Sequence, residues 1–243
     1  MVFQETKSII DFYITKDSNT MLYTKHILLF LMLSCFGLNA AAQLPENDAL
    51  NHTFSIVAHD DETGQIGVAV QSHWFSVGST VSWAEAGVGA VATQSLTNKS
   101  FGPRGLQLLK EGKSPQEALD ILIKNDEGRD FRQVAIVDVK GRVAVYTGEK
   151  CIAEAGHIKD DGFSVQANMM LNNTVWDNMA ETFENTDGPL AERMVAALQS
   201  AQAAGGDLRG QQSAAILVVE GEKSGEPWND RLIDLRVEDH PSA

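Results

Sequence analysis

Apolar and polar stretches alternate along the chain in a pattern that predicts several paired strands. Two apolar runs, TFSIVAH at 53–59 and IGVAVQS at 66–72, flank the polar segment DDETGQ, which predicts a hairpin. STVSWAEAG at 79–87 and VGAVATQS at 88–95 predict a second pair of strands. Because Ala, Gly and Val occupy both sets of alternating positions, we expect these strands to be covered on both faces.

Helical patterns follow the first four strands. GLQLLKEG at 105–112 predicts one helix, and SPQE at 114–117 predicts the start of the next, with Ser114 as its cap. Two more helices are predicted at 174–183 and 190–203. The other apolar runs predict strands at 133–139, 142–148, 162–171, 213–221 and 232–239. Strands and helices segregated into separate runs indicate an α+β fold of layered sheets and helices.

The N-terminus has the pattern of an export signal. Lys25 precedes the apolar run ILLFLML, and three small residues ending at Ala42 follow it. The run is shorter than the roughly 20 residues that span a bilayer, so no stable membrane span is expected. We therefore expect a periplasmic or secreted protein that is cleaved after Ala42. The predicted parts are an N-terminal extension with signal peptide at 1–42, a short leader at 43–52 and a single domain at 53–241.

Two alternatives at the N-terminus stay open. Met21 stands where a signal peptide of ordinary length begins, so Met1 and Met21 are both candidate start residues. Cys35 is a second candidate processing point, because lipidation there would anchor the protein to a membrane. Met32 and Leu33, which precede it, fit a lipoprotein signal poorly.

Composition and charge argue against some classes of partner and cofactor. With 33 acidic and 19 basic residues the formal net charge is -14, which argues against a nucleic-acid partner because phosphate binding needs a basic surface. The histidines are scattered without metal-ligand spacing, so neither a metal nor another cofactor is expected. Cys151, the one cysteine beyond the expected signal peptide, is expected to be a small buried apolar residue.

Several segments, taken together and in order, resemble a known family. They cover nearly all of the chain from Thr53 to Pro241: TFSIVAHD, GVAVQS, AGVGAVATQSLTN, GPRGLQLL, AGGDLRGQQSAAILVV and NDRLIDLRVEDHP. They are similar to domain of unknown function 1028, a bacterial and archaeal family assigned to the N-terminal nucleophile (Ntn) hydrolase-like fold. The resemblance implies a four-layer α-β-β-α sandwich, with two stacked antiparallel sheets between two layers of helices. A fold by itself does not fix an activity.

The resemblance makes Thr53 the candidate nucleophile. In Ntn hydrolases a Thr, Ser or Cys at the start of the first strand attacks an amide or ester carbonyl. Its own α-amino group, with a pKa of about 8, is the base. The leader precedes Thr53, so this chemistry requires a second cut between His52 and Thr53, either autocatalytic or by another protease. The alternative is that Thr53 is an ordinary β-branched strand residue.

Further polar residues are candidates for the same site, because the fold implies that the ends of the second and fourth strands lie near Thr53. His73 is a candidate for proton transfer near neutral pH. The candidates for oxyanion stabilisation or substrate binding are Ser72, Gln94, Asn98, Asn168 and Arg104. For each of them, an ordinary role in a turn, loop or core is the alternative.

Together these expectations predict a hydrolase that cleaves a C–N bond in a small-molecule amide or peptide-like substrate. The first rival is a non-catalytic protein that uses the same scaffold to bind a small ligand or a cell-wall fragment. Assembly into a homo-oligomer is a further role that this fold permits.

Overall fold

The computed structural model describes residues 49–51 and 53–243, and Asn47–Ala243 forms one compact unit. The expected signal peptide, its cleavage site after Ala42, Met21, Cys35 and His52 lie outside the described residues. No helix in the described part is long and apolar enough to cross a bilayer.

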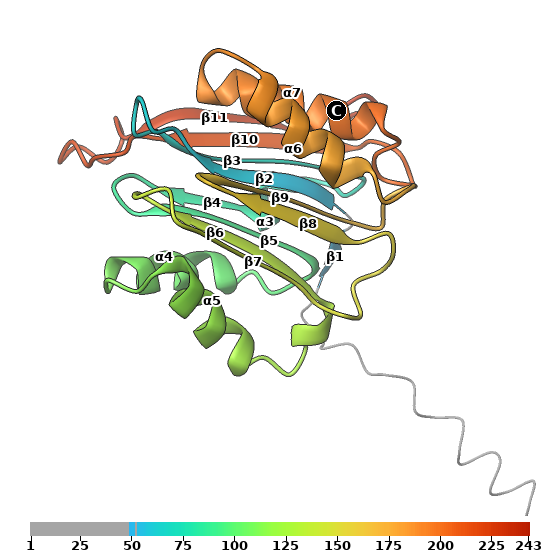
Figure 1. The fold of residues 1–243 in the computed structure, drawn as a ribbon, viewed down its shortest axis with the longest axis horizontal. Helices are drawn as coiled ribbons and strands as arrows, with labels where there is room; N and C mark the ends of the chain where they lie inside the picture. Colours follow the sequence, from blue (N-terminus) through green and yellow to red (C-terminus); the bar gives the residue numbers. More distant parts are fainter. Residues whose placement is uncertain (1–48, 52) are drawn as a thin grey trace, which may run out of the picture. The chain divides into compact units, whose positions relative to one another are not determined.

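The described chain contains two antiparallel sheets (Figure 1). The six-stranded sheet has the order β11 (Arg231–Val237), β10 (Ser213–Val219), β3 (Ile66–Ser72), β2 (Thr53–His59), β9 (Phe163–Asn168) and β8 (Gly156–Asp160). The five-stranded sheet has the order β1 (Ala49–Asn51), β5 (Gly89–Thr97), β6 (Arg132–Asp138) and β7 (Val143–Thr147), and β4 (Ser82–Glu85) also pairs with β5.

Five α-helices are present among the described residues: α3 (Gly78–Val81), α4 (Phe101–Lys110), α5 (Pro115–Lys124), α6 (Val175–Asn185) and α7 (Leu190–Ala203). A short 3-10 helix, η1 (Arg129–Phe131), precedes β6. In Figure 1, α6 and α7 lie over the six-stranded sheet, whereas α4 and α5 lie over the five-stranded sheet. The α+β class with antiparallel sheets is therefore confirmed.

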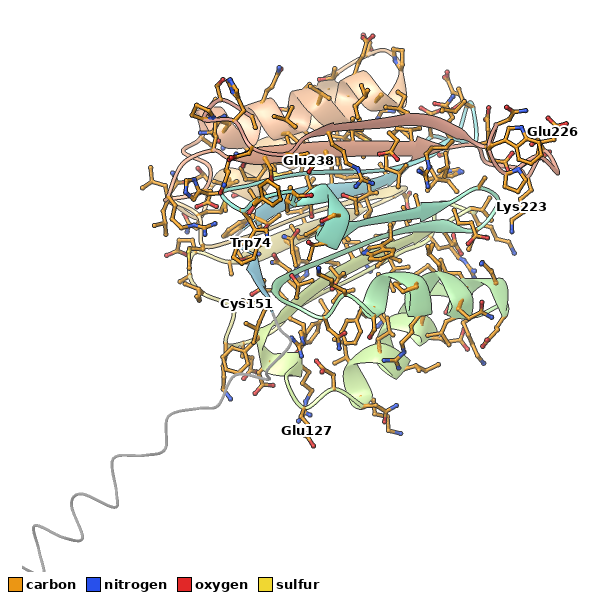
Figure 2. All side chains as sticks on the ribbon, turned by 180° about the vertical axis from the view of Figure 1, so that it is seen from behind. Trp74, Glu127, Cys151, Lys223, Glu226 and Glu238 are labelled. Atoms are coloured by element: carbon orange, nitrogen blue, oxygen red, sulfur yellow. The ribbon has the colours of Figure 1, made fainter. Side chains whose placement is uncertain are left out.

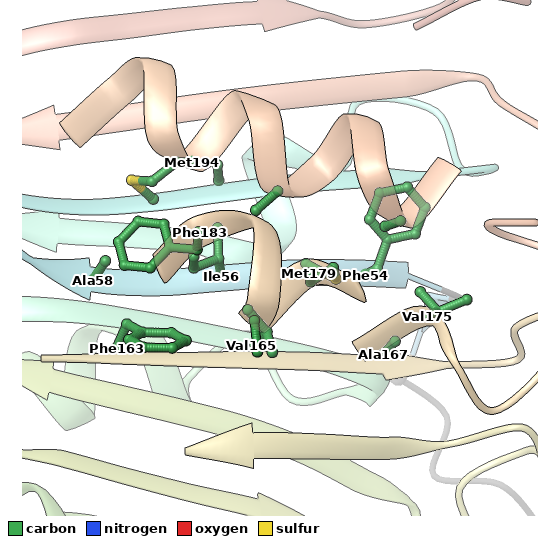
Figure 3. Close-up of a cluster of buried hydrophobic side chains, with 14 of the residues drawn as sticks. Phe54, Ile56, Ala58, Phe163, Val165, Ala167, Val175, Met179, Phe183 and Met194 are labelled. Atoms are coloured by element: carbon green, nitrogen blue, oxygen red, sulfur yellow. The ribbon is translucent and has the colours of Figure 1, made fainter. Parts of the chain in front are cut away.

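Three apolar clusters hold these elements together. One joins α6 and α7 to β2 and β9 through residues such as Phe54, Phe163 and Met179 (Figure 3). A second contains Val57 and Ala135 from the two sheets, and a third lies between the five-stranded sheet and helices α4 and α5. Because apolar side chains on both faces of β2 are buried, the prediction of strands covered on both sides is confirmed.

The structure corrects four local predictions. The predicted strand at 79–87 begins with helix α3, because Gly78 lets this turn approach β10 so closely that a Cβ there would overlap that of Ala215. Helix α4 begins at Phe101, earlier than predicted, directly after a turn in which the Asn98 side chain accepts hydrogen bonds from Ser100. Strands β1 and β8 were not predicted, and β8 is a mostly polar edge strand without the apolar alternation that marks a strand.

The predicted start of α5 is confirmed in detail. The backbone N–H of Glu117 donates to Oγ of Ser114 at 3.3 Å, and the N–H of Ser114 donates to a carboxylate oxygen of Glu117 at 2.8 Å. This reciprocal capping box satisfies two backbone donors that would otherwise lack partners at the helix end.

A buried ion pair joins the start of β6 to the loop after α5. The Arg132 side chain is 2% exposed, and it donates to the two carboxylate oxygens of Asp126 at 2.6 and 3.0 Å. It also donates to the carbonyl of Leu96 in β5 at 2.6 Å. Leu96 pairs with Leu50 of β1, so the ion pair braces the sheet where the leader strand joins it.

Replacing Asp126 with Asn should destabilise the fold strongly, because the Arg132 guanidinium would stay buried without its countercharge. The expected loss is about 3–5 kcal/mol in the free energy of unfolding, measured by urea denaturation. Asp130→Asn is the matched control, since Asp130 forms a 2.9 Å pair with Lys150 at the surface and should unfold nearly as wild type does. Equal stability of the two variants would contradict a structural role for the buried pair.

Candidate functional site

Thr53 is the first residue of β2 and lies between two neighbouring strands of the six-stranded sheet. Its direct cross-strand partners are Ser72, the last residue of β3, and Asn168, the last residue of β9. The Thr53 side chain is fully buried, and its hydroxyl donates to the hydroxyl of Ser72 at 3.3 Å. Three of the candidate site residues therefore meet at one end of the sheet.

Two amide side chains hold the carbonyl of Thr53. Nε2 of Gln94 donates to it at 3.3 Å, and Nδ2 of Asn168 donates at 3.4 Å. Gln94 lies on β5 of the other sheet, so this contact connects the two sheets directly beside Thr53. Both residues are fully buried, and Oδ1 of Asn168 has no hydrogen-bond partner among the described residues.

Gln133 on β6 connects the same amides to one another. Its Oε1 accepts hydrogen bonds from Gln94 at 2.7 Å and from Asn168 at 3.1 Å. Its Nε2 donates to the carbonyl of Ala167 at 2.9 Å, which again joins the two sheets. Since Nε2 of Gln94 also donates to the carbonyl of Gln166 at 3.2 Å, its two hydrogens are shared among three acceptors. Gln94 is thus engaged in joining the sheets rather than in offering a free donor.

Ser55 and Gln166 extend this buried cluster along β2 and β9. The Ser55 hydroxyl donates to Oε1 of Gln94 at 2.6 Å and accepts a hydrogen bond from Nε2 of Gln166 at 2.6 Å. The sequence alone did not point to Gln133, Gln166 or Ser55 as site residues. A usable signal was present, because each is a polar residue in a strand that is predicted to be covered on both faces, and a buried polar group needs partners.

Two non-glycine residues with left-handed backbone conformations lie beside the site. Ser95 has a φ of 67° and follows Gln94, and Met169 has a φ of 58° and follows Asn168. Such conformations are uncommon for residues with a Cβ atom, and they persist where the surrounding structure enforces them. Both positions lie directly after an amide side chain that binds the Thr53 carbonyl.

His73 lies at the same end of the sheet but does not bond to Thr53. Its backbone N–H donates to a carboxylate oxygen of Asp207 at 3.1 Å, and Asp207 also accepts two hydrogen bonds from the Arg209 guanidinium. The buried Nδ1 of His73 has no hydrogen-bond partner in the described part of the chain. Asp207 and Arg209 thus brace the segment that follows β3.

Arg104 lies in helix α4, and Asn98 lies shortly before the helix begins. Oδ1 of Asn98 accepts hydrogen bonds from the backbone N–H and the hydroxyl of Ser100 at 3.1 and 2.7 Å. Arg104 lies exposed in the first turns of α4. These positions support a structural role for Asn98 at the helix start and a solvated position for Arg104.

Exposed apolar side chains surround this end of β9. Ile152 is 41% exposed, Leu208 is 52% exposed and Leu171 is 65% exposed, and we call these three residues the apolar rim. Backbone hydrogen bonds connect their segments to one another: Met169 bonds to Ile152 at 2.9 Å and to Leu208 at 3.4 Å. Figure 2 shows Trp74 and Cys151 at the same end of the sheets, near β1.

Cys151 is poorly suited to act as an alternative nucleophile. Burial raises the pKa of its thiol, although hydrogen bonds with Ser95 and Gly148 oppose this shift, and the thiol donates to the carbonyl of Arg132 at 3.3 Å. A thiol with a raised pKa carries little reactive thiolate at neutral pH. Within the described residues, no group of three or more His, Cys, Asp or Glu side chains is arranged to hold a metal ion.

Comparisons with known proteins identify the family of this chain. The model of the family described as "Family of unknown function (DUF1028)" matches residues 53–243. Among solved structures, protein SPO2555 from Silicibacter pomeroyi, itself described as DUF1028, is 33% identical with a TM-score of 0.71. That match covers 79% of this chain and 80% of the other. No curated protein matches the chain. Since the family match begins at Thr53 and spans the whole of both sheets apart from β1, the chain belongs to the DUF1028 family.

Proposed function

We propose that this protein is an exported hydrolase that cleaves an amide or peptide-like bond, with Thr53 as an N-terminal nucleophile. The observation that carries the proposal is the position of Thr53 at the head of a central strand, where Gln94 and Asn168 bind its carbonyl. Oδ1 of Asn168 is buried without a partner among the described residues, directly opposite Thr53. An unpaired buried acceptor costs about 1–3 kcal/mol, and a free α-amino group at Thr53 would supply a donor.

The fold that we propose is the four-layer α-β-β-α sandwich of the Ntn hydrolases. The packing of α6 and α7 against one sheet and of α4 and α5 against the other supports it. So does the apolar cluster that contains residues from both sheets, since two sheets in face-to-face contact need a shared core.

The proposed chemistry requires a cut between His52 and Thr53. Strand β1 supports this step, because Asn51 pairs with Ser95 in the five-stranded sheet while Thr53 pairs with Ser72 in the other sheet. The chain changes sheets between Asn51 and Thr53. Hydrolysis adds one water across the bond, so that His52 gains a carboxylate and Thr53 gains a free α-amino group.

After the cut, the new α-amino group takes the proton from the Thr53 hydroxyl as the oxygen attacks the substrate carbonyl. The C–N bond breaks, the amine leaves with that proton, and an acyl ester remains on Thr53. Water then hydrolyses the ester and releases the acid. The Ser72 hydroxyl, at 3.3 Å from the Thr53 hydroxyl, orients the nucleophile, and His73 lies next to it in sequence as a candidate for proton exchange with solvent.

The apolar rim supports a substrate with an apolar part. Ile152, Leu171 and Leu208 expose their side chains near the end of β9, where such a group would be removed from water. Export to the periplasm or beyond, as proposed from the N-terminal sequence, would give the enzyme access to amides and peptides outside the cytoplasm.

Processing is the first test of this function. N-terminal sequencing and intact mass of the protein recovered from the periplasm or medium should show a chain that begins at Thr53. Thr53→Ala should keep the leader if the cut is autocatalytic, and Thr63→Ala, in an exposed turn, should be processed as wild type is. Recovery of chains that begin at Gln43 alone would refute the Thr53 mechanism.

Turnover is the second test. Processed protein should hydrolyse members of a panel of amides and peptides, and a Thr53→Ala chain produced with residue 53 as its first residue should lose this activity. Thr53→Ser should retain part of it, since a hydroxyl beside a free α-amino group remains. If wild type binds panel members without turnover and Thr53→Ala binds them equally well, the non-catalytic binding protein is the better description.

Asn168 provides a third test. Asn168→Ala removes one of the two donors to the Thr53 carbonyl together with the unpaired acceptor, and by misplacing the nucleophile it should reduce the turnover number by about 10²-fold. Asn185→Ala, on the exposed side of α6, is the matched control and should not change turnover. The thermal midpoint of both variants should be measured in parallel. A folded Asn168→Ala protein with full activity would contradict the assigned role.

A further inference from the structure

Strand β11 is an edge strand with unusual exposure. It is the last strand of the six-stranded sheet, and no strand in the described part of the chain pairs with its outer edge. Leu235 is 66% exposed, Val237 is 44% exposed and Leu232 is 41% exposed. Long apolar edge strands invite pairing with another chain, and proteins usually protect them with charges or cover them. The opposite edge, β8, carries Lys159 and His157 instead.

An apolar groove runs beside β11 on the helical side of the sheet. Ile216 of β10 pairs with Leu235, and Ala214 pairs with Val237, so these side chains share the face that α7 covers in part. The groove between α7 and β11 has a volume of about 520 Å³, and its lining includes Val195, which is 39% exposed. Helix α7 therefore leaves the apolar face of β11 uncovered.

The sequence of β11 is complementary to itself in one antiparallel register. If Leu235 of one copy lies opposite Leu235 of another, Asp234 lies opposite Arg236 and Ile233 lies opposite Val237. Arg231 then lies opposite Asp239. Around the axis each charged pair has opposite signs and each apolar pair lies on the groove side, so these central pairs are favourable, whereas Leu232 opposite Glu238 at the end of β11 is the one mixed pair.

We propose that this surface is a homodimer interface, in which two β11 strands pair antiparallel about a twofold axis at Leu235. The two six-stranded sheets then form one continuous sheet, and the groove beside each α7 faces the joined strands. A twofold axis requires a self-complementary surface, which β11 provides. Stable interfaces bury more than about 1,000 Å² in total, so the apolar groove face has to contribute beside the strand pairing.

Charge permits a second copy at this edge even though the chain as a whole is acidic. The whole chain has a formal net charge of -14, so two copies repel each other over most of their surfaces. Strand β11 carries two Arg and one Asp, and Arg231 and Arg236 both bond to Asp234 within the chain at 2.7 and 3.0 Å. The edge is thus one region where the general repulsion between copies is relieved.

The oligomeric state tests the proposal. Light scattering coupled to gel filtration of the purified protein should give about twice the molar mass of one chain. Leu235→Glu places two carboxylates opposite each other at the axis and should halve that mass. Leu171→Glu is the matched control, since Leu171 is 65% exposed but lies away from β11, and it should remain dimeric. A monomeric wild type, or a dimer that survives Leu235→Glu, would overturn the proposal.

Two variants with reversed charges test the register of the paired β11 strands. Asp234→Arg alone places two guanidinium groups opposite each other in both charged pairs around the axis, and Arg236→Asp alone places two carboxylates there. Each variant by itself should therefore be monomeric. Mixing the two should form a heterodimer, because every guanidinium at these positions then lies opposite a carboxylate. Native mass spectrometry of the mixture distinguishes the species. Failure to form the heterodimer from two folded variants would rule out this register.

Discussion

The buried amide cluster between the two sheets is the constraint around which the rest of the site is arranged. Gln94 and Gln133 come from one sheet, Gln166 and Asn168 come from the other, and they form one hydrogen-bonded cluster in which Gln94 and Asn168 donate to the carbonyl of Thr53. Removing one member would leave other buried groups without partners, at about 1–3 kcal/mol each. An apolar core could join the sheets as firmly, but it would not fix the position of one backbone carbonyl.

The cluster also explains why strained residues gather here. Ser95 and Met169 adopt left-handed conformations directly after Gln94 and Asn168, Ser95 within β5 and Met169 just beyond the end of β9. The cost of such conformations is about 1–3 kcal/mol each, and the surrounding hydrogen bonds and packing offset it. The position of the Thr53 carbonyl is therefore fixed by a structure that includes two backbone conformations of higher energy. Such strained residues are common at functional sites.

Much of the fold follows from the sequence, whereas the cluster does not. The TFSIVAH and IGVAVQS hairpin predicts that Thr53 and Ser72 lie opposite each other, and local patterns reveal most strands and helices. The amide contacts join residues up to 115 positions apart, such as Thr53 and Asn168, and no local pattern records which strands become neighbours. Asn98 shows a second limit of the sequence, since a polar residue after a strand can bond within the turn that leads into the next helix as readily as it can bind a substrate.

The burial of Thr53 conflicts with its proposed role as a nucleophile. The short strand β1 offers a way to resolve this conflict. A nucleophile has to reach its substrate, yet the Thr53 side chain is fully buried while the leader is attached. Strand β1 has three residues paired with β5, and a typical backbone hydrogen bond contributes about 0.5–1.5 kcal/mol net. Once the bond before Thr53 is cut, so short a strand loses its covalent link to β2. Its departure would uncover the edge of β5 beside Ser95 and open the end of the sandwich, so one cut would both create the base and admit the substrate.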